Sequence, residues 1–358
     1  MSRTRMAVVG CGHLGTIHAR LLAARGDVEL VAVADPLPEQ RARVAGAHGC
    51  RECGDPRQLV GAVDAVVVAA PTALHAEVSL PLLEAGIDLL VEKPLATTPA
   101  EARAIEAAAR HRGRVVAVGH VERFNPAWRL AADRCGPAVA VECHRLAPFT
   151  FRSLDVGAVL DLMIHDIDLV LSLAPGELVA VEARGVVACG GHEDAARARL
   201  GFSSGLVADL AASRIHPVLR RTATLWGRSA TVTADFNTRA VEVVGCSPAV
   251  AAGRFVAADV PFGDRPALKE RFFTDVLPRE SITADEVNAI ACEHDDFLAA
   301  VRSRGTPLVP AAAGTAALEV ACRVLEAMSC VQLGSAAPSV AVALPASSAA
   351  ASPLRKSA

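Results

Sequence analysis

The chain has 358 residues, of which 52% are hydrophobic and 21% charged, and its formal net charge is -3. This length favours two domains, because one hydrophobic core rarely extends over so many residues. The weak charge and the lack of a Lys/Arg cluster argue against nucleic-acid binding. Apolar runs stop short of the roughly 20 residues that a membrane span needs, and the N-terminus shows no cleavage signal. We expect a cytoplasmic protein that binds neither nucleic acid nor membrane.

Cysteine and tyrosine usage narrows the chemistry. The ten cysteines are scattered without an even framework, which is typical of reduced thiols that fill core space. Cys50 and Cys53 form one close pair with no second pair, so we interpret them as neither a redox nor a metal site. Tyrosine is absent from the chain. Any proton transfer therefore falls to His, Lys, Asp, Glu or Cys.

The first part of the chain alternates between apolar strand-like segments and helical segments. The strands are apolar without alternation, as in buried parallel sheets. We predict strands at 6–10, 29–35, 64–71, 88–94 and 115–120, and helices at 13–25, 38–48, 75–86 and 99–112. This order predicts a doubly wound α/β domain of the Rossmann type over residues 1–122.

The second part contains closely spaced, partly alternating segments separated by turn signals. We predict strands at 138–146, 178–188, 196–202, 206–215, 222–227 and 230–236, followed by helices at 285–304 and 312–331. The pattern predicts an α+β domain with an open, mostly antiparallel sheet over residues 123–334. Its terminal helices could pack back on the first domain. Residues 335–358 form an Ala/Ser/Pro tail that we expect to be disordered.

The segment VLDLMIHDIDLVLSL, residues 159–173, is apolar except for Asp161, His165, Asp166 and Asp168. On an α-helix with about 100° per residue, Asp161, His165 and Asp168 form one narrow stripe. A helix that is apolar on its other faces is buried, and a buried carboxylate costs several kcal/mol unless it is paired or faces a polar cavity. The stripe therefore has either a structural partner or a substrate.

A G-x-G-x-x-G motif, residues 10–15, follows the first predicted strand and opens a helix. In this context it predicts a dinucleotide site, because glycines let the backbone approach a pyrophosphate at a helix N-terminus. We expect cofactor contacts from Gly10, Gly12, His13, Leu14 and Gly15. Asp35, 20 residues past Gly15, is placed to accept the ribose 2′-hydroxyl and favours NAD over NADP. Arg41 and Arg43 lie close enough to keep NADP open.

Two further groups of residues follow predicted strands. Pro71, Thr72 and His75 come after the strand at 64–71, and Glu92 and Lys93 end the strand at 88–94. Open α/β sheets bind ligands at this carboxyl edge, so we expect all five to contact the cofactor. Lys93, fixed by a following proline, can place a cation beside the nicotinamide. A surface salt bridge between Lys93 and Glu92 is the alternative, and His75 could equally cap a helix.

The glycine motif at 10–15, the EKP at 92–94 and Asp161-x-x-x-His165 together resemble the glucose-fructose oxidoreductase/inositol dehydrogenase family, often called Gfo/Idh/MocA. The resemblance covers nearly the whole chain except the tail. It implies that Lys93 touches substrate and cofactor, that His165 is the catalytic acid/base and that Asp161 orients the pair. On this interpretation the carboxylates of the stripe hold His165 and tune its basicity. A purely structural His/Asp network is the alternative.

A finer resemblance rests on residues 119–128, 159–173 and 210–221, which are similar to the UDP-N-acetylglucosamine 3-dehydrogenase branch of that family. Asn125 and its neighbours stand at the domain junction, where donors suit sugar hydroxyls or a diphosphate. The expected substrate-binding residues are Lys93, Glu122, Arg123, Asn125, Asp161 and His165. A short basic cluster of Arg214, His216, Arg220 and Arg221 could meet the nucleotide, although a solvated loop is the alternative.

We therefore predict NAD-dependent oxidation of a nucleotide-sugar ring hydroxyl. The resemblance implies UDP-N-acetylglucosamine as substrate and its 3-keto derivative as product, made for the 3-amino sugars of lipid A or related glycans. A pyridoxal-phosphate aminotransferase would act next, and we expect a homodimer or homotetramer. The alternatives are a dehydrogenase of a free polyol such as inositol, and an NAD-binding regulatory protein. A metal enzyme is disfavoured, because His120 and Glu122 lack a third ligand at a recognisable spacing.

Overall fold

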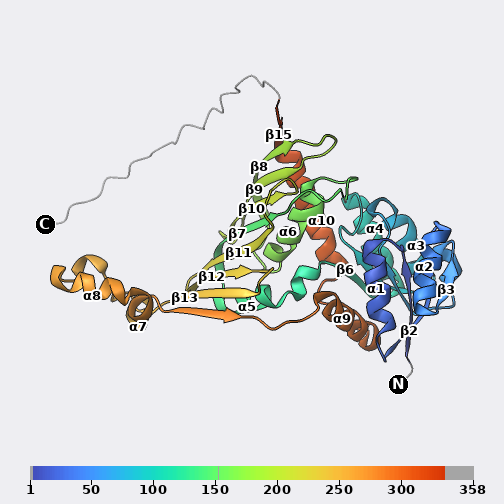
Figure 1. Ribbon diagram of the computed structural model, residues 1–358, viewed down its shortest axis with the longest axis horizontal. Coiled ribbons are helices and arrows are strands. Elements are labelled where there is room, and N and C mark those ends of the chain that lie inside the picture. The colour runs from blue at the N-terminus through green and yellow to red at the C-terminus, as the bar shows by residue number, and fades with distance from the viewer. Residues whose placement is uncertain (1–2, 152, 335–358) are drawn as a thin grey trace.

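The computed structural model describes residues 3–151 and 153–334, which form two sheets with helices packed around them (Figure 1). The tail predicted at 335–358 lies outside the described residues. Within the described part of the chain, no helix is both long enough and apolar enough to cross a bilayer.

The first domain is built on a six-stranded parallel sheet of order β3-β2-β1-β4-β5-β6. Its strands are β1 (Thr4–Val9), β2 (Val28–Ala34), β3 (Arg51–Cys53), β4 (Ala65–Val68), β5 (Asp88–Glu92) and β6 (Val116–Gly119). Its helices are α1 (His13–Ala23), α2 (Pro38–His48), α3 (His75–Glu84) and α4 (Pro99–Arg112). The predicted Rossmann-type fold is confirmed. The sequence analysis missed β3, which has only three residues, two of them exposed.

The unbroken apolar strands of this domain have a clear structural reason. Ala7 and Val9 of β1 pack in a core on one face of the sheet, and Met6 and Val8 pack in a core on the other. Because both faces are covered, alternation between polar and apolar residues is lost. The strand order reverses between β1 and β4, and ligands of doubly wound sheets bind at the carboxyl ends of strands beside such a reversal.

The second domain is built on a nine-stranded sheet of order β14-β13-β12-β11-β7-β10-β9-β8-β15, in which only β7–β10 and β8–β15 pair in parallel. Its strands are β7 (Ala138–Leu146), β8 (Leu178–Val187), β9 (Ala195–Phe202), β10 (Val207–Ser213), β11 (Arg220–Gly227), β12 (Ala230–Asp235), β13 (Ala240–Gly245), β14 (Arg279–Thr283) and β15 (Met328–Gln332). The prediction of an open, mostly antiparallel sheet is confirmed. In β9, Ala196, Ala198 and Leu200 are buried whereas Arg197 and Arg199 are exposed, which is the expected two-residue alternation.

Six helices accompany this sheet: α5 (Pro126–Cys135), α6 (Ile164–Leu171), α7 (Pro248–Ala251), α8 (Arg265–Glu270), α9 (Ala289–Ser303) and α10 (Ala311–Ala327). Short 3-10 turns span Pro56–Leu59, Thr72–Leu74, Val121–Phe124, Ala257–Asp259 and Phe262–Asp264, and π-helical turns span Val159–Met163 and Phe272–Val276. Figure 1 shows α10 between the nine-stranded sheet and the first domain, in contact with α4 and α6. Helix α9 buries Phe297 in the core shared with β1. Both terminal helices thus reach the first domain.

Two predicted boundaries were wrong. The helix predicted at 312–331 ends at Ala327, and the following residues form β15, which pairs in parallel with β8. Pairing with a distant strand outweighs the local helical pattern there. Helix α9 starts at Ala289 rather than near 285, because the Asn288 side chain accepts from the Ala291 N–H and caps the helix. Helices α7 and α8, which were not predicted, lie beyond the ends of β12 and β13 in Figure 1. Strand β14, also not predicted, pairs with β13 at the edge of the sheet.

Candidate active site

One large cavity of about 1260 Å³ lies where the carboxyl edge of the first sheet meets the second domain. The loops after β1, β2, β4 and β5 line it, together with the π-helical turn before α6 and the start of β11. Among the residues expected at the site, those that line the cavity are Gly10, Gly12, His13, Leu14, Asp35, Pro71, Thr72, His75, Glu92, Lys93, Asp161 and His165. Gly15, Glu122, Arg123 and Asn125 do not line it.

The three glycines of the loop after β1 serve different purposes. Gly10 has φ of 92°, and a Cβ on it would lie 2.5 Å from the Ala69 carbonyl oxygen. A Cβ on Gly15 would lie 1.8 Å from the Gly10 carbonyl oxygen. The fold itself therefore requires glycine at these two positions. A Cβ on Gly12 would meet nothing within 4 Å, so the space beside this backbone is open to a pyrophosphate at the N-terminus of α1.

Asp35 is held at the end of β2 by the backbone of two loops. One carboxylate oxygen accepts the Cys11 N–H at 2.8 Å and the other accepts the Leu37 N–H at 2.8 Å. Each oxygen keeps a lone pair for a ribose hydroxyl. Arg41 donates to the Asp35 carbonyl oxygen and Arg43 to the Cys11 carbonyl oxygen. Both guanidinium groups are thus engaged with backbone beside the site, which leaves the carboxylate to face the cofactor.

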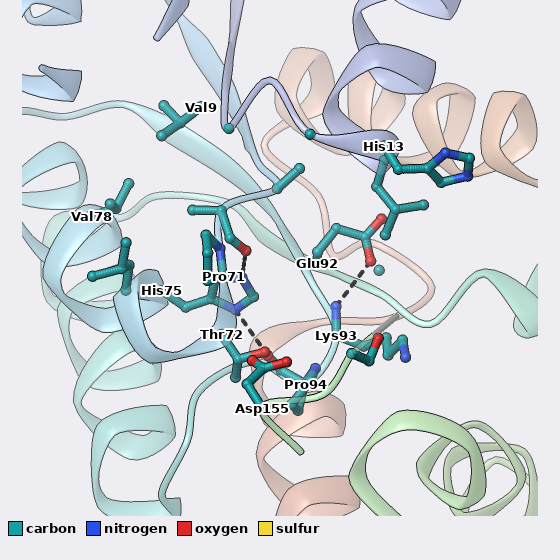
Figure 2. A pocket seen from close by; sticks show the side chains of 18 of the residues that line it. Val9, His13, Pro71, Thr72, His75, Val78, Glu92, Lys93, Pro94 and Asp155 are labelled. Carbon is teal, nitrogen blue, oxygen red and sulfur yellow. Dashed lines mark hydrogen bonds between the residues drawn. The ribbon is translucent and has the colours of Figure 1, made fainter. Parts of the chain in front are cut away.

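His75 lies under the loops that follow β4 and β5. Its Nδ1 is 2.9 Å from the Pro94 carbonyl oxygen and its Nε2 is 2.9 Å from the Ala70 carbonyl oxygen (Figure 2). The side chain is buried, and this burial lowers its pKa. His75 is the first residue of α3 and does not cap it, so the capping alternative was wrong. His75 instead bridges the loop after β4 and the loop after β5.

Glu92 and Lys93 do not form the surface salt bridge that the sequence left open. The Lys93 ammonium donates to the Asp161 carbonyl oxygen at 2.7 Å and lies 3.2 Å from Asp161 Oδ1. Glu92 is buried; one of its oxygens accepts the Lys93 backbone N–H, and the other lies 2.8 Å from His18 Nε2. His18 Nδ1 is 2.8 Å from His294 Nε2. These two histidines, remote in sequence, were missed because no local pattern links them.

The predicted α-helix at 159–173 begins with a π-helical turn at Val159–Met163 and becomes α-helical as α6. The wider turn changes the angles from which the stripe was derived. Asp161 contacts Lys93, whereas Asp168 lies 3.2 Å from the Arg123 guanidinium. Asp166, which was left off the stripe, is also buried and paired. The expectation that carboxylates of this helix hold His165 was therefore wrong.

His165 lines the cavity, but its Nδ1 is buried without a hydrogen-bond partner among the described residues. The exposed part of the ring, with Nε2, is the part that can reach a ligand. Burial, and then the positive charges of Lys93 and Arg145, hold the pKa of His165 well below 6.5. The ring is accordingly neutral at neutral pH. His120 stands edge-on to it, with ring centroids 6.3 Å apart.

A glycine loop, a half-buried lysine at a strand end and a neutral histidine thus share one cavity. The family model described as "Oxidoreductase family, NAD-binding Rossmann fold" matches residues 4–120, and the model of the GFO/IDH/MocA C-terminal domain matches residues 118–233. The chain belongs to the Gfo/Idh/MocA oxidoreductase family. The family resemblance predicted from the three motifs is confirmed.

Two relatives show where this Gfo/Idh/MocA chain lies within the family. It is 35% identical over 293 residues to UDP-N-acetylglucosamine 3-dehydrogenase of Acidithiobacillus ferrooxidans, a match that covers 80% of this chain and 93% of the relative. It is 30% identical over 339 residues to inositol 2-dehydrogenase of Rhizobium meliloti, covering 88% and 94%. A solved structure of the Acidithiobacillus enzyme matches with a TM-score of 0.79 at 32% identity, covering 92% of this chain and 98% of that one.

Glu122 and Asn125, two of the residues expected to bind substrate in this Gfo/Idh/MocA chain, are instead engaged with protein. Arg145 bonds to Glu122 at 2.6 Å and to Asp166 at 2.7 Å, and all three are buried. Asn125 donates to Glu122 and caps α5 by accepting the Ala127 N–H. Glu122 and Asn125 therefore belong to a buried cluster rather than to the cavity wall.

Arg123 and Asp168 line a second, smaller cavity of about 430 Å³ beside α10. Burial raises the pKa of Asp168 to about 7, although the neighbouring Arg123 lowers it. Arg123 thus lines a different cavity from the one that holds Lys93 and His165. Its expected contact with substrate is not supported by this position.

The basic cluster at 214–221 divides between the cavity and the surface. Arg214 and Arg221 line the large cavity, whereas Arg220 is exposed and outside its lining. Arg214 is paired with Asp194 at 2.8 Å. Arg221 stands opposite Arg145 where β11 pairs with β7. The sequence pointed to this segment but could not distinguish its members, because the strand register decides which arginine faces the cavity.

Proposed function

We propose that this chain is an NAD-dependent dehydrogenase that oxidises the C3 hydroxyl of UDP-N-acetylglucosamine to the 3-keto sugar. The observation that carries the proposal is the convergence of Gly12, Lys93 and His165 on one cavity. The 35% identity to an enzyme of that name, over 93% of its length, supports this substrate.

The chain's own residues suggest how the cofactor is held. The open backbone at Gly12 and the N-terminus of α1 suit the pyrophosphate, and the carboxylate of Asp35 suits a ribose hydroxyl. When bound, NAD supplies the acceptor for the hydride that leaves the substrate carbon.

His165 acts as the general base in this proposal. Because its pKa lies well below 6.5, the ring is neutral at working pH and its Nε2 lone pair can accept the hydroxyl proton. The ring then releases this proton to solvent. Overall, the alcohol loses a hydride to the cofactor and a proton to water.

Lys93 stabilises the negative charge that develops on the substrate oxygen. Its ammonium group has three N–H donors, and the carbonyl and carboxylate oxygens of Asp161 accept from it. A remaining donor is available to the substrate oxygen. Asp161 is the positioning residue, because it fixes the ammonium at the cavity wall.

We further propose the setting of the reaction. A ketone at C3 is the substrate that a pyridoxal-phosphate aminotransferase requires to make a 3-amino sugar, so such an enzyme would consume the product for lipid A or a related glycan. The enzyme would act in the cytoplasm, as a homodimer or homotetramer.

A free polyol is the second candidate substrate. The 30% identity to an inositol 2-dehydrogenase, which extends over 94% of that enzyme, favours it. A polyol would need only the Lys93 and His165 end of the cavity, because the glycine loop and Asp35 at the other end suit the cofactor.

The test is a comparison of NAD reduction with UDP-N-acetylglucosamine, a UDP-uronic acid and inositol. An aminotransferase and an amino donor are included, so that ketone is removed and an unfavourable oxidation can proceed. We expect turnover of UDP-N-acetylglucosamine, with mass and NMR placing the change at C3. Preference for inositol or the uronic acid, or oxidation at another carbon, would refute the proposed substrate while leaving a dehydrogenase.

A further inference from the structure

The cations that line the large cavity differ in how they are compensated. Lys93 is paired with Asp161, Arg57 with Asp55 and Arg214 with Asp194. Arg221 also lines the cavity, and its guanidinium has no hydrogen bond or ion pair with any residue that the structure describes. It is half-buried, so water compensates it only in part.

The strand pairing makes this position costly. Arg221 on β11 is directly opposite Arg145 on β7, and like charges placed directly across strands destabilise a sheet. Arg145 takes the ion pairs with Glu122 and Asp166. The charges of these carboxylates also act on Arg221, but neither carboxylate forms a hydrogen bond or ion pair with it. Burial, followed by the charge of Arg145, lowers the pKa of Arg221. An exposed cation would need no further partner, but a half-buried one in a cavity wall is suited to an anionic ligand.

Arg221 also stands near the reacting end of the cavity. Its charge adds to the burial and the other positive charges that lower the pKa of His165. The charges of Glu122, Asp166 and, less strongly, Asp161 act on Arg221 itself. In UDP-N-acetylglucosamine the diphosphate is attached to C1, two ring carbons from C3. An anion held by Arg221 therefore suits a substrate whose anionic group lies only a short distance from the carbon that is oxidised.

We propose that Arg221 binds the diphosphate of the substrate and so selects nucleotide-linked sugars over free polyols. The inference rests on the proposed function for the identity of the ligand. The planar guanidinium can donate two parallel N–H bonds to phosphate oxygens, which a neutral polyol cannot match.

The experiment measures binding of UDP and of uridine to the NADH complex by calorimetry, with saturating NADH to block the cofactor site. Three proteins are compared: the unmodified enzyme, Arg221→Gln and the matched control Arg220→Gln, which removes the adjacent exposed arginine. We expect Arg221→Gln to weaken UDP binding on the order of 10- to 100-fold while uridine binding stays unchanged. Arg220→Gln should leave both unchanged. Binding of NADH and the melting temperature should be the same in all three.

Equal losses for UDP and uridine, or none in Arg221→Gln, would overturn the inference, as would failure of UDP to bind the unmodified enzyme. Because no turnover is involved, the result is independent of the proposed reaction. If UDP binding depends on Arg221 but UDP-N-acetylglucosamine is not oxidised, the anion site stands and the proposed substrate fails.

Discussion

Two groups of ionisable side chains meet at the helical stretch 159–171, and they differ in how they are compensated. In the buried cluster, Arg145 is bonded to both Glu122 and Asp166. In the cavity group, Asp161 holds Lys93, but His165 and Arg221 keep hydrogen-bonding capacity that no described residue uses. Both groups contain charges that are expensive to bury.

This difference distinguishes charged residues that only stabilise the fold from those that can bind or act on a substrate. A cluster whose opposite charges are matched within the protein has little left with which to bind a ligand. A group in a cavity wall that leaves a base and a cation unmatched can act on a substrate. Glu122 and Asp161 were both expected at the site, but Asp161 lines the cavity and Glu122 is bonded to Arg145 away from its lining.

The largest expected effect comes from a substitution in the cavity group. His165→Asn should lower kcat by roughly 10²- to 10⁴-fold, the usual contribution of a general base, because asparagine cannot accept the hydroxyl proton. NAD binding, measured by titration, should be retained. Turnover at the rate of the unmodified enzyme would mean that His165 has only a structural role.

The next largest effect comes from a substitution in the buried cluster. Arg145→Met leaves Glu122 and Asp166 buried without their cation, so the free energy of unfolding should fall by about 3–5 kcal/mol. Denaturant titration measures it. The matched variant Arg221→Met removes the facing arginine, which forms no ion pair with a described residue and acts on Glu122 and Asp166 only through its charge, so the loss of stability should be clearly smaller. Equal destabilisation by both variants would contradict the distinction between the two groups.

A smaller effect concerns His120, which is buried beside the cavity group with neither ring nitrogen partnered among the described residues. Burial, and then the charges of Lys93 and Arg123, lower its pKa to about 3. Below pH 6.5, His120 of the unfolded chain therefore binds a proton, whereas His120 of the folded chain stays neutral until the pH approaches 3. Stability should fall as pH drops from 6.5 toward 3, with His120 contributing about 1.4 kcal/mol per pH unit.

The control is His120→Asn, which removes this titration. Denaturant titrations between pH 7 and pH 4.5 should give a shallower loss of stability for the variant than for the unmodified protein. His294, whose pKa burial also lowers to about 3, keeps part of the slope in both proteins. Parallel pH profiles would show that His120 does not titrate in this way.

The smallest effect tests the cofactor end. Asp35→Ala removes a carboxylate that can accept a ribose hydroxyl and repel a 2′-phosphate, so the preference for NAD over NADP should narrow roughly tenfold. The ratio of kcat/KM for the two cofactors measures it. Equal use of NAD and NADP by the unmodified enzyme would refute the premise that Asp35 makes the enzyme prefer NAD.

Much of the first domain was predictable because its signals are local. Unbroken apolar strands, a glycine motif at a strand end and the helical segments between strands each depend on neighbouring residues, and β1, β2 and β4–β6 lie close to the predicted segments. The lysine of EKP was placed in the cavity for the same reason. The three-residue strand β3 was missed, since so short a segment has no periodic signal.

The sequence by itself determined the parallel fold of the first domain and the open sheet of the second, because strand patterns are local. The presence of Lys93, Asp161 and His165 at one site followed from the resemblance of their motifs to the Gfo/Idh/MocA family. Only the tertiary structure decided which charge meets which. The π-helical turn at Val159–Met163, the register of β7 with β11 and the return of α9 onto α1 bring together residues far apart in the chain. Such pairings depend on packing in three dimensions, which periodicity along the chain does not record.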